Sequence, residues 1–124
     1  MFSDAMLDSS GKHLICDIKD IQNKALLQSM EGVKSLFDTI CQKYDYQVLN
    51  KIEHVFEPQG FSIIYLLSES HMSIHTFPER NYAAIDLYTC RNYRDNLVYT
   101  EIYIMLTEAF AAKFEPPVIV ERRF

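Results

Sequence analysis

Three short apolar runs between residues 62 and 90 limit the fold of this chain more than any other feature of its sequence. They are rich in β-branched and aromatic residues and span Ser62–Leu67, Met72–Phe77 and Tyr82–Cys90. Such runs predict strands. The connections between them are too short for the crossovers that parallel strands need. The sequence therefore predicts that these strands pair in an antiparallel sheet.

The remaining apolar patterns add further strands and the helices that cover the sheet. Apolar residues recur at helical spacing from Val33 to Tyr44, with Ser29 placed to cap that helix, and Pro116-Pro117 is expected to end the last helix. The expected fold is α+β: a two-layer sandwich of a mainly antiparallel sheet with helices on one face. The expected strands are Lys12–Ile18, Val48–Phe56 and a short edge strand Val118–Glu121, and the expected helices are Asp20–Met30, Glu31–Tyr44 and Asp95–Phe114.

Length and charge exclude several classes of protein. The 124 residues predict a single domain, 1–124, and the net charge of −5 with no basic patch beyond Arg122-Arg123 makes nucleic acid an unexpected partner. No apolar stretch is long enough to cross a bilayer, and acidic residues stand where a signal peptide would be basic, so we expect a cytoplasmic protein without membrane contact. The three cysteines are widely spaced, which predicts neither a disulfide framework nor a zinc motif.

The strands predicted at Ser62–Leu67 and Tyr82–Thr89 are apolar on both faces. Helices can cover only one of those faces. We therefore expect a second copy to cover the other, giving a homodimer.

The segment Ser68–Cys90 concentrates reactive side chains among apolar neighbours, and we expect it to lie inside the fold. Its serine, histidine and thiol groups suggest nucleophilic or acid–base catalysis at Ser70, His75 and Cys90. By residue type alone, each could equally be a satisfied core group. A metal site at His71 and His75 is not expected, because residues four apart on a strand lie about 13 Å apart.

The same segment resembles the small prokaryotic S-adenosylmethionine decarboxylases, which are pyruvoyl-dependent proenzymes. The resemblance rests on SESHMSIHTFPE from Ser68 to Glu79, then YAAID and TC at the family's spacing. FEPQGFS from Phe56 to Ser62 and GKHL from Gly11 to Leu14 extend it over nearly the whole chain.

The resemblance implies self-cleavage between Glu69 and Ser70, into a β chain 1–69 and an α chain 70–124. The Ser70 hydroxyl would attack the Glu69 carbonyl, and elimination from the resulting ester would leave a pyruvoyl group at residue 70. By resemblance, His75 removes the Ser70 α-proton during this processing, and Ser62 assists.

The resemblance also implies the reaction and the substrate-binding residues. The self-made pyruvoyl cofactor would form a Schiff base with the amine of S-adenosylmethionine and accept electrons as CO₂ leaves. Cys90 would return a proton, which a thiol with an ordinary pKa near 8.5 can do at neutral pH. Phe56 and Phe77 would stack on the adenine, and Glu79 would bind the ribose. The product would be the aminopropyl donor for spermidine biosynthesis.

The chain departs from the family pattern at four positions around these residues. Phe77 replaces a usual Trp, while Ile63, Asn81 and Arg91 stand where Gly is common. These changes leave open a decarboxylase for a basic amino acid such as arginine or ornithine, with Arg80 and Arg91 in the pocket. An alternative of another class, a non-catalytic regulatory partner subunit, predicts the loss of Ser70 or Cys90, and both are present.

Overall fold

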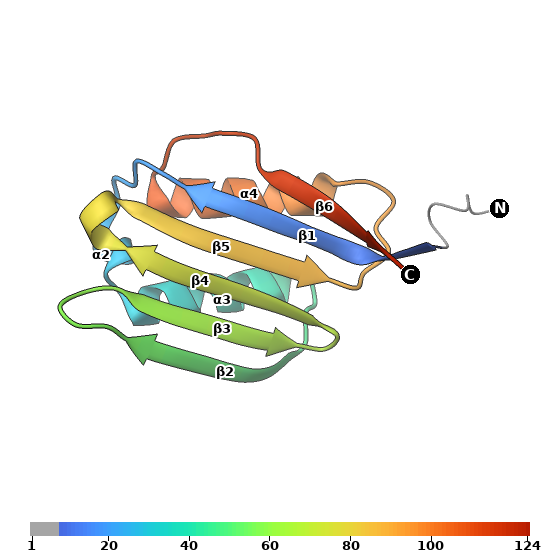
Figure 1. Ribbon diagram of the computed structural model, residues 1–124, viewed down its shortest axis with the longest axis horizontal. Coiled ribbons are helices and arrows are strands. Elements are labelled where there is room, and N and C mark those ends of the chain that lie inside the picture. Colours follow the sequence, from blue (N-terminus) through green and yellow to red (C-terminus); the bar gives the residue numbers. More distant parts are fainter. Residues whose placement is uncertain (1–7) are drawn as a thin grey trace.

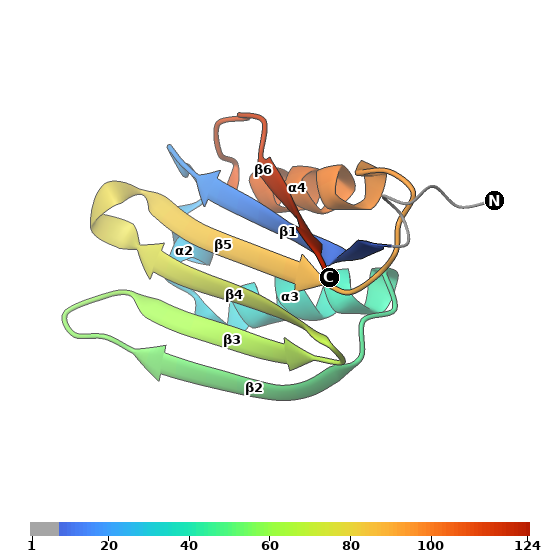
Figure 2. The same cartoon turned by 45° about the vertical axis from the view of Figure 1, so that its right-hand side comes forward.

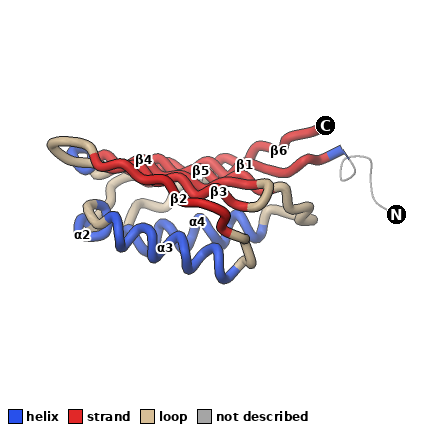
Figure 3. Tube along the Cα trace, turned by 90° about the horizontal axis from the view of Figure 1, so that it is seen from below, coloured by secondary structure: helices blue, strands red, loops and turns tan. Residues whose placement is uncertain are grey.

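The computed structural model describes residues 8–124, whose strands form one six-stranded sheet with the helices against one face (Figures 1 and 3). Every neighbouring pair of strands is antiparallel. The order across the sheet is β2-β3-β4-β5-β1-β6, so the first strand of the chain lies between the last two. The strands are β1 Ser9–Ile18, β2 Val48–Val55, β3 Phe61–Leu67, β4 Ser70–Phe77, β5 Tyr82–Thr89 and β6 Val118–Arg123.

The helices are α2 Lys24–Leu27, α3 Met30–Lys43 and α4 Leu97–Phe110, with a 3₁₀ turn, η1, at Pro78–Arg80. The predicted cap of α3 is confirmed, because the Gly32 N–H donates to Ser29 Oγ at 2.9 Å. Figure 2, turned from the first view, shows α3 and α4 behind the sheet. The predicted α+β sandwich is therefore confirmed, including the edge strand near the C-terminus.

Two predicted helices have different bounds in the structure. The helix expected over Asp20–Met30 is wrong except for α2: Asp20 has a φ of 53°, and α2 begins only after Asn23, whose side chain accepts the Leu26 N–H. The last helix ends at Phe110 and not at the proline pair, since Ala111 takes a left-handed φ of 49°.

Burial alternates along the central strands, so the sheet has a buried face toward the helices and a more exposed face, called the open face, on the other side. The buried face packs against α3 and α4, and it includes Ile63, Ile74 and Ile85 at 3% exposure or less. On α4, Val98, Met105 and Ala109 are only half-buried. The buried α4 residues are instead Tyr99, Ile102, Tyr103, Leu106, Thr107 and Phe110.

Polar groups at the edge of this core have partners in the helix layer. The buried Tyr65 hydroxyl donates to Asp38 Oδ1 at 2.7 Å, and Lys51 Nζ lies 2.9 Å from the same oxygen. Burial pushes the pKa of Asp38 upward, but the hydrogen bonds from Tyr65 and Lys51 outweigh it and hold that pKa below its usual value. This ion pair helps to hold β2 against α3.

The open face carries exposed apolar side chains on several strands. Ile52 on β2 and Ile64 and Leu66 on the neighbouring strand β3 are 63%, 42% and 52% exposed, and Val120 is exposed on β6 at the opposite edge of the sheet. No helix of the described residues covers this face (Figure 3). Exposed apolar residues gathered in this way are typical of an interaction surface.

Within residues 8–124 no helix combines the length and the apolar character that a membrane span requires. The acidic opening of the chain, on which the argument against a signal peptide rests, falls almost wholly in residues 1–7, outside the described part.

Candidate active site

The predicted cleavage point lies in a two-residue turn between β3 and β4. Leu67 pairs with Ser70, which leaves Ser68 and Glu69 to make the turn. Glu69 has a φ of 55°, in the left-handed region that favours Gly. A non-glycine residue held there stores backbone strain of about 1–2 kcal/mol. The peptide bond after Glu69 is therefore attached to a strained residue.

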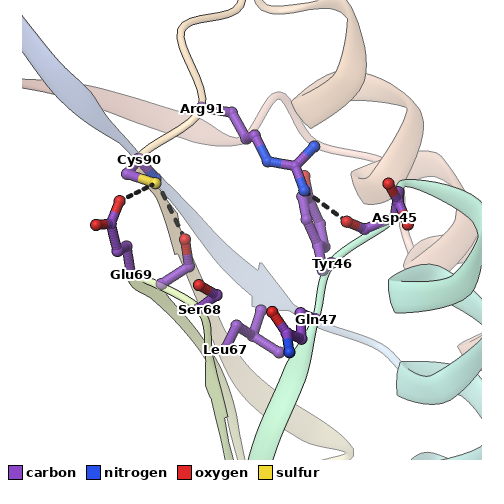
Figure 4. Close-up of a pocket in the computed structure, with 9 residues that line it drawn as sticks. Asp45, Tyr46, Gln47, Leu67, Ser68, Glu69, Cys90 and Arg91 are labelled. Atoms are coloured by element: carbon purple, nitrogen blue, oxygen red, sulfur yellow. Dashed lines mark hydrogen bonds between the residues drawn. The ribbon is translucent and has the colours of Figure 1, made fainter.

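Ser70, Cys90 and Glu69 contact one another beside this turn. The Cys90 N–H donates to Ser70 Oγ at 3.2 Å. The Cys90 thiol donates to Glu69 Oε2 at 3.3 Å (Figure 4). Ser70 is buried at 9% exposure, and Cys90 is half-buried. The structure thus brings the Ser70 hydroxyl and the Cys90 thiol together at the turn that carries Glu69.

A cavity of about 640 Å³ opens in front of these groups. Its far wall comes from the loop between α3 and β2, where the Arg91 guanidinium donates to the Tyr44 and Asp45 carbonyls and lies 5.1 Å from the Tyr46 ring (Figure 4). The sequence offered no signal for Tyr46, Asp45 or Gln47 as cavity residues, because only the fold brings that loop to the end of β5. Arg91 serves here as a brace between two loops.

A second cluster lies at the opposite end of the β3–β4 pair, on the open face. Ser62 Oγ lies 2.6 Å from His75 Nδ1, since these residues pair directly across the two strands. They line a cavity of about 330 Å³ together with the two predicted aromatic residues and the predicted acid: Phe56, Phe77 and Glu79, joined by Gln59 and Thr76. The predicted substrate-binding residues are thus neighbours.

The turn that carries Glu79 ends in a residue with a left-handed backbone. Asn81 follows η1 with a φ of 49°, which agrees with its place at a usual glycine. Phe77 is 38% exposed and lies 5.6 Å from the Tyr82 ring, so one side of the ring is supported.

Within one chain the two clusters do not meet. Ser70 and His75 stand five residues apart on β4, which separates them by about 16 Å. His75 and His71 lie on the open face, so the expectation that the whole segment Ser68–Cys90 is interior is wrong for these two side chains. In a single protomer His75 cannot reach the Ser70 α-proton.

The fold and the two clusters define a class: a two-layer α+β protein with a hydroxyl and a thiol at a strained hairpin, and an imidazole with aromatic rings at the hairpin's other end. The family model described as S-adenosylmethionine decarboxylase matches residues 12–117. The chain belongs to this family.

Relatives and a solved structure agree with that assignment. The chain is 44% identical over 80 residues to S-adenosylmethionine decarboxylase proenzyme 2 of Bacillus cereus, covering 64% of each chain. It is 37% identical over 95 residues to the proenzyme of Bacillus cytotoxicus, covering 77% of this chain and 72% of that one. The match thus spans somewhat less than two thirds of the length of the first relative. The crystal structure of the adenosylmethionine decarboxylase from Aquifex aeolicus has the same fold, with a TM-score of 0.80 at 22% identity over 94% of this chain and 93% of that chain.

Proposed function

We propose that this chain is a self-processing proenzyme that decarboxylates S-adenosylmethionine, with one domain over residues 1–124. The observation that carries the proposal is the meeting of Ser70, Cys90 and the strained Glu69 in front of one cavity. A cytoplasmic location stays a prediction, and the three free cysteines agree with a reducing compartment.

Processing begins at the Glu69–Ser70 bond. The Ser70 hydroxyl attacks the Glu69 carbonyl carbon, the peptide C–N bond breaks, and the chain continues through an ester with a free amine on Ser70. Removal of the Ser70 α-proton then expels the Glu69 carboxylate. The resulting dehydroalanine tautomerises to an imine, and water converts it to the keto group with release of ammonia. Relief of the left-handed conformation at Glu69 favours the first step.

The residues around Ser70 fit a pyruvoyl group at that position. Ser70 is buried, its Oγ has one N–H donor, and a cavity large enough for a small substrate adjoins it. The group supplies an electron-accepting carbonyl for decarboxylation. The Cys90 thiol, whose residue contacts Ser70, would serve as the proton donor, and in the uncleaved chain it donates to Glu69 Oε2.

The second cavity favours a substrate with a flat ring over an aliphatic basic amino acid. Phe56 and Phe77 line this cavity and are 48% and 38% exposed, and Glu79 on the same wall offers a carboxylate that can accept a hydrogen bond from a sugar hydroxyl. Aromatic faces also attract a sulfonium cation. Arg80 does not line either cavity, and Arg91 is engaged with backbone carbonyls. These facts support S-adenosylmethionine over arginine or ornithine.

In a homodimer whose protomers pack through their open faces, the Ser70 cluster of one protomer and the His75 cluster of its partner can form one site. About 16 Å lies between Ser70 and His75 in one chain, and the open face carries the exposed apolar residues. A two-fold axis through the middle of β4 places the partner's His75 near Ser70 and repeats the arrangement in reverse. Each site then takes Ser70 and Cys90 from one protomer, and the cavity with Phe56 and Phe77 from the other.

Cleavage and turnover test the proposal directly. The wild-type chain should yield two fragments by mass spectrometry, and the second should carry a carbonyl that hydrazine traps. Ser70→Ala should remain whole, and two fragments from it would contradict the mechanism. Cys90→Ala should cleave and yet lose most CO₂ release from carboxyl-labelled S-adenosylmethionine. Release from labelled arginine or ornithine in the same assay would favour the alternative substrates.

Coexpression of two uncleavable variants tests the shared site. The His75→Ala variant retains Ser70 but lacks the histidine, and the Ser70→Ala variant retains the histidine but lacks the serine. Neither variant should cleave when it is expressed alone. In mixed dimers the Ser70 of one chain meets the partner's His75, so about half of the His75→Ala chains should be cut under random pairing. If the His75→Ala chains stay whole in mixed dimers, the shared site is refuted.

A further inference from the structure

Three side chains of the ligand type meet on the open face: His13 from β1, His71 from β4 and Asp86 from β5. Their donor atoms all lie within 4.8 Å of one another. His13 Nδ1 is 3.6 Å from Asp86 Oδ1, and His71 Nε2 is 3.3 Å from Asp86 Oδ2. None of the three lines either cavity described above, and the reaction proposed above assigns them no part.

The register of the sheet produces this cluster. β5 lies between β1 and β4, and Tyr88 on β5 pairs with both His13 and His71. Asp86 is two residues away on the same face, so each of its oxygens reaches toward one imidazole. The Tyr88 ring lies 4.7 Å from the His13 ring and 5.9 Å from the His71 ring, and its hydroxyl donates to the Ser10 carbonyl at 2.6 Å. Tyr88 therefore holds both imidazoles in place.

One oxygen of the cluster lacks the partner that a buried oxygen needs. Asp86 Oδ1 is inaccessible to solvent and accepts no hydrogen bond from the described residues. The His13 nitrogen at 3.6 Å is too far to donate one. An orphaned carboxylate oxygen costs stability, whereas a cation between the imidazoles would satisfy it. Ligands at about 2.0–2.1 Å from a tetrahedral zinc ion are about 3.3 Å apart. The three donor atoms already lie within 4.8 Å of one another, so small rotations of these side chains would bring them to that spacing.

We propose that His13, His71 and Asp86 form a binding site for a divalent transition-metal ion of the zinc type. Two imidazoles and one carboxylate suit zinc and its neighbours, with water in the open position, while Mg²⁺ and Ca²⁺ prefer oxygen ligands. The sequence prediction of no metal considered His71 only with His75 and missed Asp86 and His13, which arrive from other strands. The bound ion ties β1 to β4 and β5, and the site stands independently of the proposed decarboxylation.

Arg122 on β6 competes with this site. Its Nη1 lies 3.3 Å from His13 Nε2, and a guanidinium can only donate. This contact occupies the Nε2 lone pair and places the ring proton on Nδ1, the nitrogen that faces Asp86. Metal binding through Nδ1 needs the other tautomer, so the exposed Arg122 side chain must turn away. Removal of Arg122 should therefore tighten metal binding.

Zinc titration of the purified full-length chain against a chromophoric chelator tests the site. We expect one ion per chain, a loss of about a hundredfold or more in affinity for His13→Ala and Asp86→Asn, and tighter binding for Arg122→Ala. His54→Ala is the matched control, since His54 is an exposed histidine on the same face outside the cluster, and its affinity should equal wild type. Circular dichroism checks that each variant is folded.

Two further readouts separate this site from the cysteines. The cobalt-substituted protein should give a visible spectrum without a thiolate charge-transfer band. Zinc should raise the melting temperature of wild type and leave that of Asp86→Asn unchanged. Zinc binding no tighter than millimolar, equal affinity in Asp86→Asn, or a thiolate band would each overturn the site. None of these measurements uses enzymatic activity, so the proposed reaction can fail without affecting them.

Discussion

The left-handed conformation of Glu69 should set the rate of self-cleavage, and two substitutions isolate its effect. Glu69→Ala and Glu69→Gly both remove the carboxylate that accepts the Cys90 thiol. Only Gly adopts a φ of 55° without steric cost. The difference between the two variants is therefore the stored strain, about 1–2 kcal/mol. If the first step releases that strain, Glu69→Gly should cleave about five- to thirtyfold more slowly than Glu69→Ala.

The assay follows the uncut chain by mass spectrometry after synthesis in a cell-free system. The same pair is then compared by urea unfolding in the Ser70→Ala background, where no cleavage occurs. If residue 69 is strained, the Glu69→Gly chain should be more stable than the Glu69→Ala chain. If it is not strained, glycine should lower stability, because it increases the conformational entropy of the unfolded chain. A Gly variant that cleaves as fast as the Ala variant refutes the role assigned to the turn.

Two further predictions concern the thiols and acid stability. Of the three thiols only Cys90 should react with a disulfide reagent near pH 8 in the folded Ser70→Ala chain, because burial raises the pKa of Cys16 to about 12 and that of Cys41 to about 11; two rapid equivalents would contradict this. The pKa of Asp38 lies below its usual value, since its hydrogen bonds from a tyrosine and a lysine outweigh burial, so its stabilising effect is present above about pH 4 and lost as the pH falls further. Asp38→Asn should therefore reduce stability at pH 7 and leave a shallower acid transition in circular dichroism, and an unchanged transition would count against the ion pair.

Much of the fold could be predicted because its pattern is local. The strands between Ser62 and Thr89 are short apolar runs rich in β-branched and aromatic residues, and the connections between them allow only antiparallel pairing. The end of α4 was not predictable in this way: Ala111 takes a left-handed φ without being Gly or Asn. The segment Asp20–Met30 has helical spacing, yet its first residues leave the helix because Asp20 also takes a positive φ.

The sequence named the residues of the candidate site, but it did not predict where the fold places them relative to one another. The family resemblance indicated Ser70, His75 and Cys90, and the aromatic pair shares a cavity as expected. The distance between Ser70 and His75 was not apparent from the motif, because they are only five residues apart in the sequence. Both lie on the extended strand β4, which separates them by about 16 Å. The cluster of His13 with Asp86 was not apparent because these residues are far apart in the sequence, and only the pairing of β1 with β5 brings them together.

The strand order governs what becomes of the two fragments. A cut after Glu69 assigns β1, β2 and β3 to one piece and β4, β5 and β6 to the other, so the pairs β3–β4, β5–β1 and β1–β6 all cross between pieces. The fragments are thus interleaved, with β1 of the first enclosed by two strands of the second. Neither half retains a complete hydrophobic layer alone, so they should co-purify without any covalent link and separate only when the whole sheet is denatured.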